Sequence, residues 1–266
     1  MTSKSPVVLT IAGFDPSGGA GIIADVRTIV EFGCRPVAAM TSLTFQNAAG
    51  VFGATHETAK SLRAQIVPIM QEHEIAAVKV GMLPIAELVS EVATFVRENG
   101  LPAPVVDPVL RSSSGYELME SDAVEVFVRE LLPHARLLTP NIPEAESLTE
   151  VEICDEQDMR RAAAKLREMG ARAVLIKGGH AQQRAEGRGQ KAEGREAIDL
   201  LDDEGELTIL RGEWIAAPPV RGTGCMLSSA IAASLAHGAD LITAVNAAKK
   251  YVAAEIQNSK LMTIQR

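Results

Sequence analysis

Aromatic residues are scarce in this chain, because Phe, Tyr and Trp together make up 3% of its 266 residues. Proteins that hold single-stranded nucleic acid stack successive bases on aromatic side chains, so such a surface is not expected here. The formal net charge is -8 at pH 7, and the sequence contains no basic cluster. A chain with this charge is not expected to bind nucleic acid or an anionic membrane surface.

Cysteines are also few. Cys34, Cys154 and Cys225 are odd in number, lie far apart and form no Cys-x-x-Cys pair. This spacing favours neither a disulfide framework nor a zinc knuckle, and it fits a reducing compartment. The apolar run at 7–12 is too short for a signal-peptide core or a membrane span. We therefore expect a cytoplasmic protein that does not enter a membrane.

The hydrophobic residues, 47% of the chain, are enough for a large core. No linker rich in Pro or Ser divides the sequence, so we expect one domain over residues 1–266. Short apolar runs alternate with amphipathic stretches, which predicts an α/β fold with a central, mostly parallel sheet covered on both faces. The predicted strands include 7–12, 37–43, 76–80, 105–106, 137–138 and 173–177; the predicted helices include 20–32, 62–71, 84–98, 226–237 and a helix from the capping residue Asp155 to Gly170.

Polar side chains follow several of these strands at the point where each strand ends. They are Asp15, Gln46, Asp107, Asn141 and Lys177. In open parallel sheets, ligands bind beyond the carboxyl ends of the strands. The sequence therefore predicts that these side chains converge on one cleft.

Two glycine-rich turns stand out. The turn Gly222-Thr223-Gly224-Cys225 follows the extended segment 214–220 and opens a helix of small residues. Its glycines allow a sharp turn and a close approach to a ligand, and the free N–H groups of a helix start favour a phosphate. Alternatively, such a turn only packs. The second turn, 15–21, follows the first predicted strand.

Seven motifs together resemble the hydroxymethylpyrimidine/phosphomethylpyrimidine kinases of thiamine synthesis, within the ribokinase-like fold. They occur in the same order over 7–237 and are Asp15-Pro16-Ser17-Gly18-Gly19-Ala20-Gly21-Ile22, Gln46-Asn47, Gly81-Met82, Asp107-Pro108-Val109, Thr139-Pro140-Asn141 with Glu144, Lys177-Gly178-Gly179-His180, and Gly222-Thr223-Gly224-Cys225. The resemblance implies a three-layer αβα sandwich that uses ATP and Mg²⁺ and acts on a small aminopyrimidine. We also expect a homodimer.

The resemblance implies that Gln46 binds the pyrimidine. A Gln amide donates and accepts at once, which matches a ring nitrogen beside an exocyclic amine; without the flanking motifs it is an ordinary loop residue. The remainder of the pocket is expected at Gly13, Ala20, Met82 and Asp25. Asp25 alternatively lies on the polar face of its helix.

Cys225 stands where the wider fold carries a catalytic Asp and where pyrimidine kinases carry Cys. At a helix N-terminus the pKa of a thiol falls, so Cys225 is expected to act as a base toward the substrate hydroxyl. The alternative is a small buried hydrophobic residue. Gly222, Thr223 and Gly224 are expected to stabilise the transferred phosphoryl group.

The resemblance also implies a nucleotide and metal site. Lys177 is expected to contact phosphate, and Asn141 and Glu144 resemble the group that holds Mg²⁺, directly or through water. The same two residues also stand at capping-box spacing. Asp107 is either electrostatic support for the metal or a turn former.

The chain departs from the family in three places. Pro219-Val220-Arg221 stands where relatives carry a polar pair before the turn, Met226 replaces a common Thr, and the Gly-rich C-terminal tail is missing. We expect Arg221 to take over nucleotide phosphate binding. The polar segment 180–196 is either a surface loop or a flap over the nucleotide.

Three functions are weighed. The first is a Mg-ATP-dependent kinase acting on 4-amino-5-hydroxymethyl-2-methylpyrimidine and its monophosphate. The second is a pyridoxal or pyridoxine kinase of the same fold, because those rings also carry a hydroxymethyl group. The third is a non-catalytic pyrimidine-binding regulator, against which the intact phosphate motifs argue.

Overall fold

The computed structural model describes residues 5–112, 114–180, 196–215 and 220–264. Within these residues the strands form one nine-stranded sheet in the order β3-β2-β1-β4-β5-β6-β7-β8-β9. The strands are β1 Val7–Phe14, β2 Arg35–Asn47, β3 Gly50–His56, β4 Ile75–Val80, β5 Val105–Val106, β6 Leu137–Leu138, β7 Ala173–Ile176, β8 Glu196–Asp203 and β9 Glu206–Glu213. Strands β2, β1, β4, β5, β6 and β7 are parallel. Antiparallel pairs add β3 at one edge and β8 and β9 at the other.

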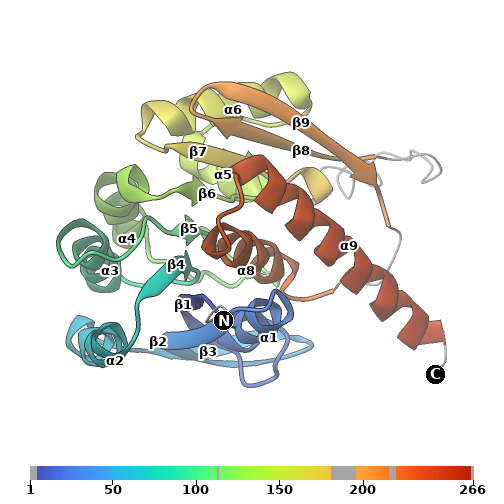
Figure 1. Ribbon diagram of the computed structural model, residues 1–266. Coiled ribbons are helices and arrows are strands. Elements are labelled where there is room, and N and C mark those ends of the chain that lie inside the picture. The colour runs from blue at the N-terminus through green and yellow to red at the C-terminus, as the bar shows by residue number, and fades with distance from the viewer. Residues whose placement is uncertain (1–4, 113, 181–195, 216–219, 265–266) are drawn as a thin grey trace.

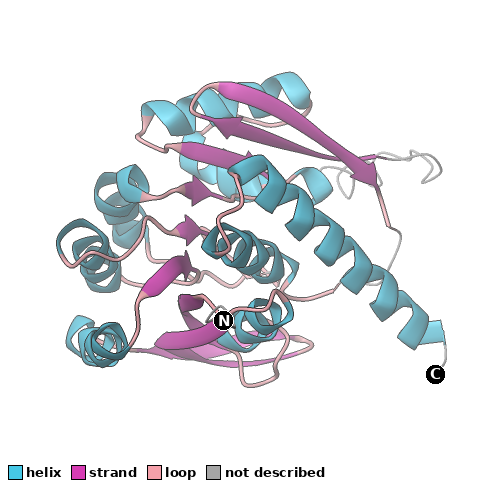
Figure 2. Cartoon of the chain, viewed as in Figure 1, coloured by secondary structure: helices cyan, strands magenta, loops and turns pink. Residues whose placement is uncertain are grey.

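Helices cover both faces of the sheet (Figures 1 and 2). One face carries α1 Gly21–Glu31, α8 Thr223–Ala236 and α9 Leu241–Ile264. The other carries α2 Ala59–Glu72, α3 Ala86–Glu98, α4 Ser121–Val126, α5 Ile142–Thr149 and α6 Glu156–Glu168. Short turns η1 Phe127–Leu131, η2 Leu132–His134 and η3 Gly178–His180 complete the described elements. The predicted three-layer αβα arrangement is confirmed.

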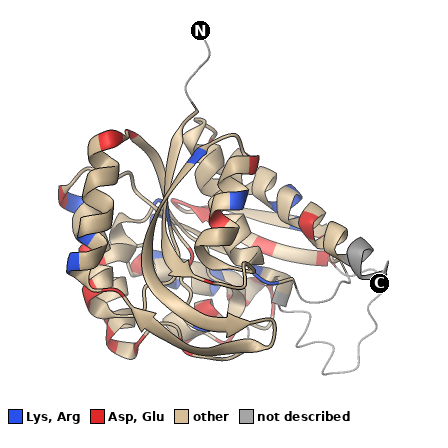
Figure 3. Cartoon of the chain, turned by 90° about the horizontal axis from the view of Figure 1, so that it is seen from below, with Lys and Arg blue, Asp and Glu red and all other residues tan. Residues whose placement is uncertain are grey.

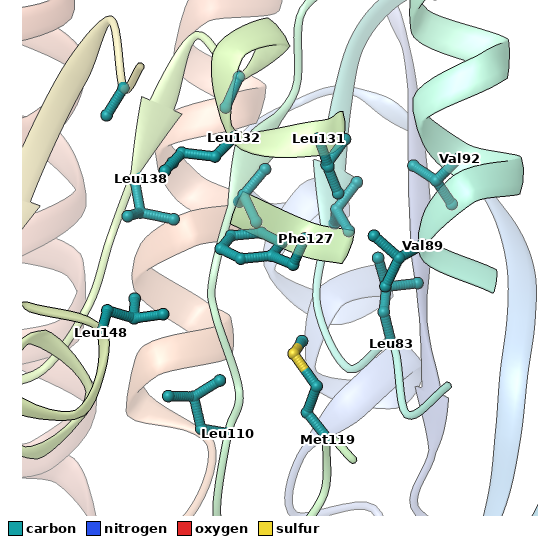
Figure 4. Packing of buried hydrophobic residues seen from close by; sticks show 14 of the residues in the cluster. Leu83, Val89, Val92, Leu110, Met119, Phe127, Leu131, Leu132, Leu138 and Leu148 are labelled. Atoms are coloured by element: carbon teal, nitrogen blue, oxygen red, sulfur yellow. The ribbon is translucent and has the colours of Figure 1, made fainter. Parts of the chain in front are cut away.

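The core divides into two clusters because successive strand residues point to opposite faces. On β1, Leu9 and Ile11 belong to the cluster under α2 to α6, whereas Val8 belongs to the cluster under α1, α8 and α9. Figure 4 shows part of the first cluster, with Phe127 and Leu131 gathered near Val89. Burial of both faces explains why the strands are almost continuously apolar.

Two predicted helix starts are wrong. Pro84 does not open α3, because Ile85 is the extended N-cap residue and the helix begins at Ala86. Helix α8 begins at Thr223, three residues earlier than expected, so Gly222 is its N-cap residue. Most of the predicted polar segment 180–196 and of the predicted extended segment 214–220 lies outside the described residues, which leave out 181–195 and 216–219.

Charges of both signs are mixed along the same surface helices (Figure 3). Among the described helices, none combines the length and the apolar character that a membrane crossing requires.

Candidate active site

A pocket lies at the carboxyl ends of β1, β2 and β4, beside the start of α8. Its lining residues are Ala12, Gly13, Asp15, Ala20, Gly21, Thr44, Gln46, Lys79, Met82, Val109, Leu118 and Cys225. Four of the five predicted ring-binding residues, Gly13, Ala20, Gln46 and Met82, are therefore brought together, and Cys225 joins them. The prediction that the polar side chains at the strand ends converge on one cleft is confirmed for Asp15 and Gln46, which both line this pocket.

The two glycine-rich turns are packed against each other. Gly222 has a φ of 76°, which favours glycine, and a β-carbon there would lie 2.3 Å from the Gly19 carbonyl oxygen. Gly21 has a φ of 57°, and its β-carbon would lie 2.2 Å from the carbonyl oxygen of Gly13. Real β-carbons do not approach an oxygen so closely, so both positions require glycine. Gly222 therefore has a packing role, and this role is compatible with ligand binding by the same turn.

Gly224, in the first turn of α8, adjoins the charged side chains that directly follow β5 and β7. A β-carbon on Gly224 would lie 3.1 Å from Asp107 Oδ2 and 3.2 Å from Lys177 Nζ. Lys177 Nζ in turn lies 2.7 Å from Asp107 Oδ1. The first turn of α8, with its free N–H groups, and the Lys177 ammonium group thus face the same small volume, which suits an anion.

Glu144 is a buried carboxylate at this end of the site. Burial and the charge of Asp107 raise the pKa of Glu144 to about 7, although Lys177 and hydrogen bonds from the backbone of Asn141 and Leu110 oppose the change. Burial also opposes a raised pKa at Lys177, but the carboxylates of Asp107 and Glu144 outweigh it and raise the pKa of Lys177. The carboxylates of Asp107 and Glu144 and the ammonium group of Lys177 therefore lie close together, next to Gly224.

The capping alternative for Asn141 and Glu144 is confirmed. The Asn141 N–H donates to Glu144 Oε2 at 2.8 Å, and the Glu144 N–H donates to Asn141 Oδ1 at 2.9 Å. This capping box starts α5, and it holds the Glu144 carboxylate in position. The side chain of Asp107 faces Lys177 and accepts a hydrogen bond from Thr139.

A magnesium ion fits this donor set when a nucleotide brings it. In the described part of the chain, no group of three or more His, Cys, Asp or Glu side chains is placed to hold a metal ion. Mg²⁺ keeps several waters and binds substrate phosphates with one or two carboxylates from the protein. Asp107 and Glu144 supply that number, and a cation beside them would offset the burial and the charge of Asp107 that together raise the pKa of Glu144.

The expected low pKa of Cys225 is wrong. The thiol lies at the start of α8, and the Gly21 N–H donates to its sulfur, but burial raises the pKa of Cys225 to about 11. The charge of Lys79 lowers it, whereas the carboxylates of Asp25 and Asp107 raise it further. The lowering of the thiol pKa by the helix start is therefore outweighed by burial and by two nearby negative charges.

Asp25 neither lines the pocket nor lies on an exposed polar face of its helix, the two positions expected from the sequence. Its side chain is fully buried beneath the pocket, where it accepts hydrogen bonds from Lys79, Thr10 and Ser229. Helix α1 directs it inward because α8 covers this side of the sheet.

Lys79 is a pocket residue that the sequence analysis missed. It lies in β4, it is fully buried, and it lines the pocket next to Cys225. A lysine inside the apolar run 75–80 is a signal for such a site, because a buried ammonium group requires a partner. A β-carbon on Gly81 would lie 2.7 Å from Lys79 Nζ, which explains the glycine of the Gly81-Met82 motif.

Arg221 is directed toward the first glycine-rich turn. One guanidinium nitrogen donates to Asp15 Oδ2 at 3.0 Å, and the other donates to Ser17 Oγ at 2.9 Å. Burial opposes a low pKa at Asp15, but interactions with Ser17, Gln46 and Arg221 outweigh it and lower the pKa. Phosphate binding by Arg221 stays a prediction, because its guanidinium group is paired with Asp15 and Ser17 of the first glycine-rich turn.

Comparison with known proteins identifies the family. The model of the phosphomethylpyrimidine kinase family matches residues 15–265. The chain belongs to this family. A hydroxymethylpyrimidine/phosphomethylpyrimidine kinase of Streptomyces coelicolor is 42% identical over 94% of this chain and 88% of its own. A Geobacter sulfurreducens protein named as a thiamine biosynthesis bifunctional protein is 38% identical over 94% of this chain, which spans 49% of that protein.

Solved structures of kinases share the fold with this family member. A phosphomethylpyrimidine kinase from Clostridium difficile 630 has a TM-score of 0.79 and 35% identity, over 95% of this chain and 100% of that chain. A Staphylococcus aureus pyridoxal kinase in complex with AMP-PCP and pyridoxal has a TM-score of 0.84 and 29% identity, over 96% of this chain and 89% of that chain. The ribokinase-like fold expected from the motifs is confirmed.

Proposed function

We propose that this chain is a Mg-ATP-dependent kinase that phosphorylates 4-amino-5-hydroxymethyl-2-methylpyrimidine and then its monophosphate, in the synthesis of thiamine. The observation that carries the proposal is that the first turn of α8 borders both the pocket and the charged residues Asp107 and Lys177. Cys225 lines the pocket together with Gln46, whereas the adjacent Gly224 faces Asp107 and Lys177. A ring bound in the pocket would therefore place its hydroxyl group next to a phosphate bound at the helix start, as phosphoryl transfer requires.

The pocket residues are proposed to bind the ring. Gln46 donates to the ring nitrogen and accepts from the exocyclic amine. Ala20 and Met82 provide apolar contact. A β-carbon on Gly13 would lie 3.0 Å from Met82 Sδ, so glycine at position 13 keeps these two segments close and the pocket narrow.

The start of α8 is proposed to bind the transferred phosphoryl group. The backbone at Gly222, Thr223 and Gly224 offers N–H groups to its oxygens, and Lys177 offers a positive charge. The ring hydroxyl oxygen bonds to the γ-phosphorus as the bond from that phosphorus to ADP breaks, and the hydroxyl proton passes to an oxygen of the transferred phosphoryl group or to water. Asn141 would act at the nucleotide site indirectly, because its backbone N–H donates to the Glu144 carboxylate and holds that carboxylate in place.

Mg²⁺ would be held by Asp107 and Glu144, directly or through water, together with the nucleotide phosphates. Bound there, the ion would neutralise phosphate charge as the leaving group departs. Cys225 is proposed to contact the ring and help place its hydroxyl group. With a thiol pKa of about 11, it is protonated at neutral pH and is a poor candidate for the base.

A turnover assay tests this function against the alternatives. The purified chain is given ATP and Mg²⁺ with the aminopyrimidine, its monophosphate, or pyridoxal, and ADP release is measured. Higher kcat/KM with the aminopyrimidine supports the proposal, and higher kcat/KM with pyridoxal makes the chain a pyridoxal kinase like the Staphylococcus aureus protein. Ring binding without turnover leaves only the regulator.

Residues 1–266 are further proposed to act as one cytoplasmic domain that forms a homodimer. None of its three cysteines forms a disulfide bond, as in a reducing compartment. The edge hairpin of β2 and β3 exposes apolar side chains: Phe52 is 67% exposed, Phe45 49% and Leu43 39%. Light scattering should give the mass of a dimer for the wild type and of a monomer for Phe52→Glu. A monomeric wild type would contradict the dimer alone.

A further inference from the structure

Asp199, in β8, binds the backbone of the residue that follows Lys177. The Gly178 N–H donates to Asp199 Oδ1 at 2.8 Å, and this hydrogen bond is buried. The other carboxylate oxygen, Oδ2, accepts from Lys249 Nζ at 2.5 Å, and the same ammonium group donates to the Leu210 carbonyl oxygen at 3.0 Å. Lys249 belongs to α9, which packs against this part of the sheet (Figure 1). One carboxylate therefore connects α9 to the backbone next to Lys177.

The chain leaves the sheet at this point, which explains why a side chain has to accept the Gly178 N–H. Strand β7 ends at Ile176, opposite Leu200 in the antiparallel pair with β8, and Gly178 begins the short turn η3. A β-carbon on Gly178 would lie 1.7 Å from the Ile198 carbonyl oxygen, so the turn passes too close to β8 for a side chain. A buried N–H without an acceptor costs free energy. The Asp199 carboxylate supplies the acceptor.

The backbone of Lys177 is held on both sides of its side chain. Its own N–H donates to the Pro140 carbonyl oxygen at 2.8 Å, and the next N–H along the chain is the one that Asp199 accepts. From this backbone the side chain of Lys177 extends toward the start of α8, where its Nζ lies 3.2 Å from the position of a β-carbon on Gly224. The place of the ammonium group at the helix start therefore depends on the contact with Asp199.

We propose that Asp199 is a positioning residue of the nucleotide site: by accepting the Gly178 N–H it keeps the Lys177 ammonium group where phosphate binds, and Lys249 holds Asp199 in turn. The proposal rests on the proposed function, from which it takes the phosphate contact of Lys177. Asp199 is not among the residues that line the ring pocket, so its loss should weaken binding of the nucleotide and not of the ring. A residue that only stabilised the fold would affect both ligands alike.

The test uses the full chain and the non-hydrolysable nucleotide AMP-PCP with Mg²⁺. Isothermal titration calorimetry gives the Kd of AMP-PCP and, separately, the Kd of the aminopyrimidine. Asp199→Leu removes the acceptor at similar volume, so the Kd of AMP-PCP should rise about tenfold or more through the loss of a buried hydrogen bond. The Kd of the aminopyrimidine should change less than about twofold.

Asp199→Asn gives a second reading, because an amide has one accepting end and one donating end. If its oxygen accepts from the Gly178 N–H, its –NH₂ group faces the Lys249 ammonium group, and two donors are set against each other. Asp199→Asn should therefore raise the Kd of AMP-PCP, and adding Lys249→Met should lower it again. Lys249→Met alone should have a smaller effect than Asp199→Asn, because the carboxylate still accepts from Gly178.

Asp203→Leu is the matched control. Asp203 lies in the same strand and also forms an ion pair, with Arg136 at 3.1 Å. It stands opposite Ala173, however, at the other end of β7 from the nucleotide site. Its loss should leave the Kd of both ligands within about twofold of the wild type.

An unchanged Kd of AMP-PCP in Asp199→Leu would overturn the inference, as would equal rises for both ligands. Equal losses in Asp199→Asn, Lys249→Met and their double variant would also overturn it, because the ion pair alone would then matter. If Asp199→Leu does not fold, as judged by circular dichroism, these last three variants decide the matter.

Failure of the proposed function is read separately, on the wild type. Binding of AMP-PCP without turnover of any ring contradicts the kinase function alone, whereas a wild type that binds no AMP-PCP contradicts both proposals. If the wild type prefers another ring, that ring replaces the aminopyrimidine in the comparison.

Discussion

Lys79 and Asp25 form a completely buried ion pair: Lys79 Nζ lies 3.0 and 2.9 Å from the two Asp25 carboxylate oxygens, and both side chains are 0% exposed. Burial alone opposes a charged lysine, but the charge of Asp25 outweighs it and raises the pKa of Lys79. Lys79 is therefore charged at neutral pH. It places a fixed positive charge in the pocket lining, beside Cys225.

Removing one partner of this pair should be costly. In Lys79→Met the Asp25 carboxylate stays buried with only two hydroxyl donors, and we expect a loss of ~3–5 kcal/mol in the free energy of unfolding. Urea denaturation at pH 7 measures it. The double variant Lys79→Met/Asp25→Leu should recover part of the loss because it leaves no unpaired charge.

Arg111→Met is the control for this measurement. Arg111 and Glu117 form an exposed pair, with side chains 68% and 74% exposed, so its removal should change stability by less than ~1 kcal/mol. Equal losses in Lys79→Met and Arg111→Met would show that the buried pair is not what stabilises this region.

Gly224→Val should abolish turnover while the chain stays folded. The added side chain would crowd Asp107 and Lys177, which lie 3.1 and 3.2 Å from the position of a β-carbon. We expect kcat to fall by a factor on the order of 10² or more, as for loss of a group that stabilises charge in the transition state. Gly212→Val is the control, because the nearest atom to its β-carbon lies 4.0 Å away. Full activity in Gly224→Val would remove the phosphate role of this turn.

Gln46→Leu should weaken binding of the pyrimidine far more than binding of ATP. Each buried polar group that loses its partner costs ~1–3 kcal/mol, so we expect the KM for the pyrimidine to rise about tenfold or more. Gln71→Leu, at an exposed position near the end of α2, provides the control. An unchanged KM for the pyrimidine in Gln46→Leu would favour a different ring.

The thiol of Cys225 should resist ionisation. Iodoacetamide labelling in a Cys34→Ser/Cys154→Ser background should give a midpoint near pH 11, because burial raises the pKa of Cys225 to about 11. Since the thiol is protonated at pH 7, Cys225→Ser should keep kcat within about tenfold of wild type. Cys225→Asp should be worse, because it adds a carboxylate beside Asp25 and Asp107. A loss of 10² or more in Cys225→Ser would restore the base role.

Glu144 should make both nucleotide binding and stability depend on pH. Its pKa is about 7 in the folded chain against an ordinary value of 4.5, so between these values the folded state binds more protons than the unfolded state. Its contribution to stability is therefore fully present below about pH 4.5 and is lost as the pH rises through about 7. Affinity for Mg-ATP should change in the opposite direction, rising as the carboxylate ionises.

Glu144→Gln should remove both effects because the amide does not titrate. Thermal unfolding and the KM for Mg-ATP, each measured from pH 5 to pH 8, compare the variant with the wild type. Parallel pH profiles for the two proteins would assign the titration to another group.

The sequence predicted the framework of the site because its signals are local. A buried parallel strand is a run of apolar residues, and the polar residue that ends it must lie at the ligand edge of the sheet. Asp15, Asp107 and Lys177 were found in this way. The convergence of Gln46 with Cys225 followed from the same rule together with the motif order.

The features that escaped prediction depend on contacts between distant segments. Asp25 looks like a residue on the polar face of a helix until α8 is placed over it. The pKa of Cys225 depends on burial and on carboxylates from two other elements, which outweigh the helix start. The partner of Arg221 lies in the first turn of the fold, 206 residues away.

The contact between Gly19 and Gly222 also limits how this protein can change. A β-carbon at 222 would lie 2.3 Å from the Gly19 carbonyl oxygen, so position 222 cannot take a side chain while the first turn keeps its form. Substitutions in the two loops should therefore be inherited as matched sets. A chimera that takes its first turn from one relative and its last turn from another should fold its sheet and yet fail to assemble the site.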